Sequence, residues 1–170
     1  MRKLVKKILT EQALYYDDVS MPKGFEINPL ELVQSINKSL YLQKDFIFSK
    51  SWDMLNKYVI ENINLNYRIS LRNKNSWGNI YIPGEKTEPL LNINPVDYKN
   101  SPDFVLLYGI NTKDCNVRIY YDDNRRKGRN FDIELKNNMF IMFPSTNMYY
   151  INNKQTESLN FIQTITYEFV

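Results

Sequence analysis

The spacing of apolar residues changes along the chain, and this change constrains the fold of the 170-residue sequence more than any other feature. Before about residue 65, apolar residues repeat every three to four positions, which is typical of amphipathic helices. From Leu65 onward they alternate with polar residues or form short apolar runs, which indicates strands. Two helices followed by about seven or eight short strands predict an α+β chain, mainly β, dominated by a sandwich or barrel.

Two helices are expected between residues 25 and 65. Asn28 can cap the first helix, Pro29 suits its first position, and Glu31 is placed to complete a capping box. The second helix begins near Ser51. Each helix has an apolar stripe that we expect to lie in the core: Leu32, Val33, Ile36 and Leu40 in the first, and Trp52, Leu55, Val59 and Ile63 in the second.

Residues 66–170 carry the strand patterns, separated by turn signals such as Pro83-Gly84 and Lys127-Gly128. Met139–Phe143 is apolar throughout, which predicts a strand covered on both faces. Phe131–Leu135 alternates strictly, which predicts one face in the core and one face in solvent. The predicted strands are Arg68–Arg72, Trp77–Ile82, Phe104–Ile110, Val117–Tyr121, Phe131–Leu135, Met139–Phe143 and Leu159–Phe169.

We divide the chain into an N-terminal arm, residues 1–24, and a single domain, residues 25–170. Leu4 and Ile8 would lie on one face of a basic helix that is too short to be stable alone. It is either a frayed terminus or an arm that docks on a partner chain or an anionic surface. No apolar run reaches the roughly 20 residues that cross a bilayer, and the basic start lacks the apolar core of a secretory signal.

The composition excludes several classes of chemistry. The sequence has no histidine and one cysteine, Cys115. It therefore has no internal disulfide, no thiolate zinc cluster and no nucleophilic device that depends on histidine. The net charge of +3 is too small to indicate nucleic acid by itself. We expect no catalytic residue, no cofactor and no metal ion.

The strand motifs follow one another in a recognisable order between Trp77 and the end of the chain. They are Trp77-Gly-Asn-Ile-Tyr-Ile-Pro-Gly-Glu, Phe104–Gly109, Val117–Tyr121, Phe131–Leu135, Met139–Ser145 and Thr164-Ile-Thr-Tyr-Glu-Phe. Their order resembles the double-stranded β-helix (jelly-roll, cupin-like) of the 2-oxoglutarate/Fe(II) oxygenase superfamily. The resemblance is closest to small oxygenase-like proteins of marine tailed phages. It implies a rolled-up pair of sheets over a little more than half of the chain.

The resemblance also implies where metal ligands would lie. The chemistry of that family needs two imidazoles and one carboxylate on one face of iron. The first two ligands would follow Glu88-Pro89, where this chain has Leu90, Leu91, Asn92, Ile93 and Asn94. The distal histidine would fall near Tyr149, and the basic residue that clamps the keto acid would fall within 160–166, which holds no Arg or Lys. We expect the chain to be inactive as an oxygenase.

Two tyrosines stand near the distal ligand position, and we expect Tyr149 and Tyr150 to fill or rim the place of the metal. They are also candidate aromatic anchors for a partner. A basic loop is either a solvated hairpin tip or a contact for phosphates or for an acidic protein patch. The candidate partner-binding residues are Arg125, Arg126, Lys127, Arg129, Tyr149, Tyr150, Leu4 and Ile8.

The favoured hypothesis is a non-catalytic binding or structural module of a tailed phage, in the neck or tail of the virion or in its assembly, with protein partners. One alternative is a residual oxygenase with unconventional ligands such as Asn92, Asp97 and Tyr149. Another is a phage regulator that binds nucleic-acid machinery. The expected location is the host cytoplasm during infection, or the virion, with neither secretion nor a membrane segment.

Overall fold

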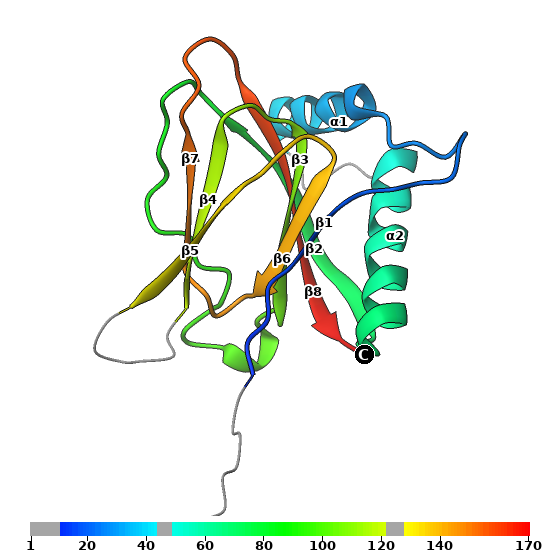
Figure 1. The fold of residues 1–170 in the computed structure, drawn as a ribbon, viewed down its shortest axis with the longest axis vertical. Coiled ribbons are helices and arrows are strands. Elements are labelled where there is room, and N and C mark those ends of the chain that lie inside the picture. The colour runs from blue at the N-terminus through cyan, green and yellow to red at the C-terminus, as the bar shows by residue number, and fades with distance from the viewer. Residues whose placement is uncertain (1–10, 44–48, 122–127) are drawn as a thin grey trace, which may run out of the picture.

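The computed structural model describes residues 11–43, 49–121 and 128–170. The chain folds into two packed sheets, and both helices lie against the larger one (Figure 1). In chain order the elements are β1 (Tyr15–Asp18), α1 (Pro29–Leu42), α2 (Lys50–Tyr67), β2 (Leu71–Tyr81), the 3₁₀ turn η1 (Tyr98–Asn100), β3 (Phe104–Asn111), β4 (Cys115–Tyr121), β5 (Arg129–Glu134), β6 (Met139–Pro144), β7 (Tyr149–Asn153) and β8 (Asn160–Phe169).

The two sheets have the topology of a double-stranded β-helix. Within the described residues, the larger sheet has five strands in the order β1-β6-β3-β8-β2, and the smaller sheet has three in the order β5-β4-β7. Strand pairing is antiparallel throughout these ladders. From β5 to β8, consecutive strands alternate between the sheets, since β5 and β7 belong to the smaller sheet and β6 and β8 to the larger one. The predicted α+β, mainly β fold class is confirmed.

Helix α1 begins as predicted, because Asn28 caps it with its side chain and Pro29 occupies its first position. The predicted capping box is wrong. The Glu31 carboxylate instead accepts hydrogen bonds from the backbone N–H groups of Lys50 and Ser51, both at 3.2 Å, and from the Ser51 hydroxyl. The first N–H groups of a helix have no partner within the helix and favour negative charge. Glu31 therefore ties α1 to the start of α2.

The apolar stripes of both helices pack on the outer face of the larger sheet, largely as predicted. Leu40 is the exception and is 54% exposed. Residues four positions apart are offset by about 40° around the helix axis, so Leu40 is turned away from the face that holds Leu32. The buried stripe passes through Ser35 and Ser39 instead. Contact with the sheet is close at Gly78 of β2, where a Cβ would lie 2.1 Å from the side chain of Ile36. Neither helix in the described part of the chain is long and apolar enough to cross a membrane.

Two cores result from this arrangement, one between helices and larger sheet and one between the sheets. In β3, Leu106 belongs to the first core and Val105 to the second. The segment 139–143 of β6 is buried at every position, so the prediction of a strand covered on both faces is confirmed. Phe131 of β5 is 43% exposed despite the alternation, because β5 is an edge strand of the smaller sheet.

Some predicted boundaries were wrong. The predicted strand Arg68–Arg72 overlaps the end of α2, where Arg68 is the left-handed C-cap with φ of 59°, and β2 begins only at Leu71. Two strands, β1 and β7, have no predicted counterpart. β1 has the sequence Tyr-Tyr-Asp-Asp, which carries no apolar alternation, and its backbone is ordered by pairing with β6.

Part of the predicted arm belongs to the folded domain. β1 pairs with β6 from Tyr15 opposite Met142 to Asp18 opposite Met139. Val19 follows it into the core and is buried. The division at residue 24 therefore does not coincide with the edge of the folded structure. Leu4 and Ile8 lie outside the described residues.

Candidate functional site

The two segments that the resemblance assigns to iron ligands lie side by side at the β7 edge of the smaller sheet. The backbone N–H of Leu90 donates to the carbonyl of Tyr149 at 2.9 Å, and the N–H of Tyr149 donates to the carbonyl of Leu90 at 3.0 Å. Farther along, Lys86 forms a bridge with Asn152. The segment 86–90 therefore runs antiparallel beside β7 and extends the smaller sheet. This places the residues after Glu88-Pro89 next to the start of β7, as the resemblance implied.

Tyr149 fills the interior at this position. Its side chain is buried, with 3% exposed, and its ring packs edge-on against Phe143 with a centroid distance of 5.1 Å. Leu90 packs against the same cluster. The Asn92 side-chain amide donates a hydrogen bond to the Tyr149 hydroxyl at 3.0 Å. Burial raises the pKa of Tyr149, and the hydrogen bond from Asn92 offsets this only in part. The neutral phenol is therefore the stable form.

These residues do not fit the iron centre of the oxygenase family. Leu90 has no atom in its side chain that could bind a metal, and Asn92 offers only a neutral amide oxygen in place of an imidazole or a carboxylate. Asp97 accepts a hydrogen bond from the Asn100 side chain at 2.7 Å. In the described ranges, no three His, Cys, Asp or Glu side chains gather closely enough to hold a metal ion.

The closing strand β8 has amide and hydroxyl groups where the resemblance places the keto-acid clamp. Asn160 is buried, its amide donates to the Lys113 carbonyl and to the Asn153 side chain, and its oxygen accepts from the Lys113 N–H. Thr164 accepts a hydrogen bond from the Asn79 side chain at 2.9 Å. The side chains of Asn160 and Thr164 are therefore engaged by other parts of the chain. None of these groups carries the positive charge that would bind a carboxylate.

Solved structures with the same fold include prolyl hydroxylases and a non-heme alpha ketoglutarate dependent epimerase. A prolyl-4-hydroxylase from Pseudomonas putida is 13% identical over 92% of this chain and 86% of that chain, with a TM-score of 0.65. A prolyl hydroxylase from Trichoplax adhaerens, solved with a hypoxia inducible factor peptide, is 13% identical over 91% and 83%, with a TM-score of 0.62. The non-heme alpha ketoglutarate dependent epimerase SnoN from nogalamycin biosynthesis is 7% identical over 92% and 77%, with a TM-score of 0.64.

The structural likeness establishes the fold. The chain has an oxygenase-like double-stranded β-helix, as the motif order indicated. No protein-family model and no curated protein matches the sequence. At 7–13% identity, shared fold carries no statement about shared chemistry.

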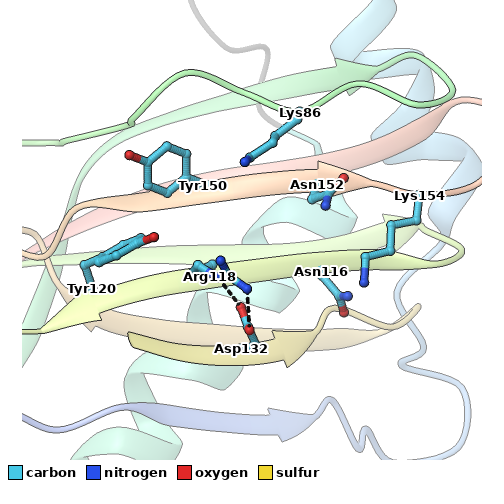
Figure 2. Close-up of a pocket in the computed structure, with 8 residues that line it drawn as sticks. All are labelled: Lys86, Asn116, Arg118, Tyr120, Asp132, Tyr150, Asn152 and Lys154. Atoms are coloured by element: carbon cyan, nitrogen blue, oxygen red, sulfur yellow. Dashed lines mark hydrogen bonds and ion pairs between the residues drawn. The ribbon is translucent and has the colours of Figure 1, made fainter. Parts of the chain in front are cut away.

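A groove of about 210 Å³ lies on the opposite face of the smaller sheet (Figure 2). Its side chains come from β4, β5, β7 and the neighbouring segment around residue 86, and they point away from the sandwich interior. Tyr150 faces this groove, whereas Tyr149 faces the interior, because successive strand residues point to opposite faces. The lining residues are Lys86, Asn116, Arg118, Tyr120, Asp132, Tyr150, Asn152 and Lys154.

Two kinds of contact organise the groove. The Arg118 guanidinium donates two hydrogen bonds to the Asp132 carboxylate, at 2.7 and 2.8 Å, and these lower the pKa of Asp132. The rings of Tyr120 and Tyr150 pack edge to face with a centroid distance of 5.4 Å. The Lys86 ammonium lies over the Tyr150 ring, 5.8 Å from its centroid. One wall of the groove is therefore the ion pair of Arg118 and Asp132, whose charges offset each other, and the other wall consists of the rings of Tyr120 and Tyr150.

The structure separates the predicted partner-binding residues. Arg125, Arg126 and Lys127 lie outside the described residues, and Arg129 is an exposed residue at the start of β5. The buried ring of Tyr149 is not presented to a partner, whereas Tyr150 is half-buried at the groove. Partner binding at these positions stays a prediction. The groove itself was missed, although the alternating polar residues of β4, of β7 and of the position after β7 carried a signal for it: Asn116, Arg118, Tyr120, Tyr150, Asn152 and Lys154.

Proposed function

We propose that this chain is a non-catalytic binding protein on an oxygenase-like fold. The observation that carries the proposal is the hydrogen bond between Asn92 and Tyr149, at the place where the resemblance puts iron ligands. A buried neutral phenol, held by an amide and packed on Phe143, occupies that place. The amide and hydroxyl groups of Asn160 and Thr164 are likewise engaged by the protein itself.

A more specific form of this proposal is a structural or assembly module of a tailed phage, with protein partners, in the host cytoplasm or the virion. Its support is the resemblance of the motif order to phage proteins. Mass spectrometry of purified particles tests it directly. A regulator of nucleic-acid machinery is the related alternative, and the basic residues 125–129 would be its contact surface.

The second candidate function is a residual oxygenase with unconventional ligands such as Asn92, Asp97 and Tyr149. The observation that favours it is the set of solved neighbours, which are oxygenases and related non-heme enzymes. It requires Tyr149 to lose its proton or its hydrogen bond before binding a metal, because a neutral phenol is a poor ligand.

Iron binding separates the two candidate functions. Purified protein would be mixed with Fe(II) and 2-oxoglutarate without oxygen, and bound iron and visible absorption would be measured. We expect no stoichiometric iron and no absorption change that depends on the keto acid. Stoichiometric iron with such a change would overturn the non-catalytic proposal in favour of the oxygenase.

A variant with restored ligands provides the matched control. Leu90→His, Asn92→Asp and Tyr149→His together place two imidazoles and one carboxylate at the three positions. Circular dichroism would first establish that the variant is folded. We expect it to bind Co(II), with the d–d absorption of a protein-bound ion, while the unchanged chain does not. A folded variant without metal affinity would mean that these positions do not converge on one ion.

A further inference from the structure

We propose that the outer groove of the smaller sheet binds a small acidic molecule with a hydroxyl-rich body, such as a sugar that carries a carboxylate or a phosphate. This goes beyond the proposed function, because the groove and Tyr149 lie on opposite faces of β7. The inference depends on the charges, the free amides and the size of the groove.

Charge is the first observation. Three cations and one carboxylate line the groove, and Arg118 is already paired with Asp132. Lys86 and Lys154 remain, and neither ammonium group forms an ion pair with any residue that the structure describes. Glu134, the next carboxylate on β5, does not line the groove. Its Oε2 atom lies 3.9 Å from the Lys136 Nζ atom. The groove therefore has an excess of positive charge that suits an anion.

Two amides between these charges are the second observation. Asn116 of β4 and Asn152 of β7 are paired in the strand register, so their side chains lie next to each other on the outer face (Figure 2). Both are half-buried, and neither side chain has a hydrogen-bond partner among the described residues. An amide offers a donor and an acceptor together, as a hydroxyl group does. Two adjacent free amides therefore suit neighbouring hydroxyl groups of a ligand.

The size and the aromatic wall define the ligand further. A groove of about 210 Å³ is smaller than the roughly 300–1,000 Å³ of drug-sized pockets, which favours a ligand with a single ring. The Tyr150 ring forms the apolar part of the groove wall. Lys86 lies over this ring and Tyr120 packs edge-on to it, so its face is not open for stacking a base. A small acid fits these constraints better than single-stranded nucleic acid does.

Titration of the full chain with defined probes tests the inference. The probes are glucuronate, glucose 6-phosphate, neutral glucose and inorganic phosphate, with affinity measured from amide chemical shifts. We expect one or both sugar acids to bind at least about tenfold more tightly than glucose and than phosphate. Comparison of the two acids identifies the anionic group. Failure of both acids to bind, or equal binding of glucose or of phosphate, would overturn the inference.

Substitutions place the binding in the groove. Lys86→Met and Lys154→Met are each expected to weaken the better sugar acid about tenfold, and Asn152→Ala to weaken it less. Lys57→Met is the control, because this exposed lysine lies on α2 beside Glu61, remote from the smaller sheet. Unchanged affinity in the Lys86→Met/Lys154→Met double variant would overturn the inference. The result of the iron experiment is independent of this outcome.

Discussion

Tyr149 and Tyr150 are consecutive residues on β7 that lie on opposite faces of the smaller sheet. Tyr149 is almost fully buried between the sheets and is held by Asn92 and Phe143. Tyr150 is half-buried outside, between Tyr120 and Lys86. Because strand residues alternate between faces, one residue type serves the core at the first position and a groove at the second. Tyr149 and Tyr150 therefore have different environments, although they are neighbours in the sequence.

The same difference extends to the polar groups around each tyrosine. Inside, Asn92, Asn160 and Thr164 form hydrogen bonds with other parts of the chain. Outside, the side chains of Asn116 and Asn152 have no such partner within the described ranges. Buried polar groups that are satisfied by the protein contribute to a defined core, whereas unsatisfied groups on a concave surface are available to a ligand. The interior groups named here are thus engaged by the protein, whereas the two amides outside stay available for the ligand that we propose.

Replacing each of the two tyrosines with alanine should give the largest difference in stability between the two faces. Tyr149→Ala should lower the free energy of unfolding by about 3–5 kcal/mol, because it removes a buried ring from a packed core. Tyr150→Ala should lower it by less than about 2 kcal/mol, because solvent already reaches that ring. Urea unfolding followed by circular dichroism measures both values. Similar losses in the two variants would remove the distinction between the faces.

Alkaline pH tests the interior separately. Burial raises the pKa of Tyr149 above the value of about 10 for an exposed tyrosine. Between these two values the unfolded chain releases a proton that the folded chain keeps, so stability is full below pH 10 and falls as the pH rises. Tyr149→Phe should flatten this fall by up to about 1.4 kcal/mol per pH unit. Burial also raises the pKa values of three other tyrosines: Tyr81, Tyr108 and Tyr167. These residues contribute to the fall in stability of both the unchanged protein and the Tyr149→Phe variant.

The hydrogen bond between Asn92 and Tyr149 should have a smaller effect. A double-mutant cycle with Asn92→Ala and Tyr149→Phe isolates it, and we expect a coupling energy of about 1 kcal/mol at neutral pH. Unfolding free energies of the four proteins give this value. Tyr150→Phe combined with Asn92→Ala is the control cycle, because Tyr150 faces away from Asn92. A coupling near zero in the first cycle would mean that Tyr149 is held by packing alone.

The smallest expected effect on stability concerns the exposed pair of Arg118 and Asp132. Arg118→Met should leave the unfolding free energy nearly unchanged, because solvent screens surface ion pairs. The same change should raise the pKa of Asp132, since the hydrogen bonds from Arg118 hold it low. Any stability from this pair is present at neutral pH and is lost as the pH falls through the pKa of the folded Asp132. Carboxyl chemical shifts during a pH titration measure the pKa, and an unchanged value would contradict the predicted pairing.

The sequence predicted the features that depend on local periodicity. The stripe of α2 and the apolar strand β6 lie where their patterns placed them, since burial on one or both faces leaves a direct pattern. The strand β1 was not predicted, because it is ordered by pairing with β6. The bonds from Glu31 to the start of α2 were missed for a similar reason, since they join residues about 20 positions apart.

The candidate site was predictable only in part. The motif order placed Tyr149 opposite the segment after Glu88-Pro89, and the two do pair. The bond from Asn92 was not predicted, because it depends on how a loop without regular structure turns inward. The outer groove needs the register of β4, β5, β7 and the segment around residue 86, and no local pattern specifies which residues stand opposite one another.

The pairing of β1 with β6 bears on the self-association of this chain. β1 covers the outer edge of β6, a strand that is buried at positions 139–143. Without β1, that edge would offer a row of unpaired N–H and C=O groups beside apolar side chains, which is the arrangement that recruits strands from other molecules. Residues 15–18 cover this edge, and we expect that shortening the chain past Asp18 would promote self-association in addition to weakening the fold.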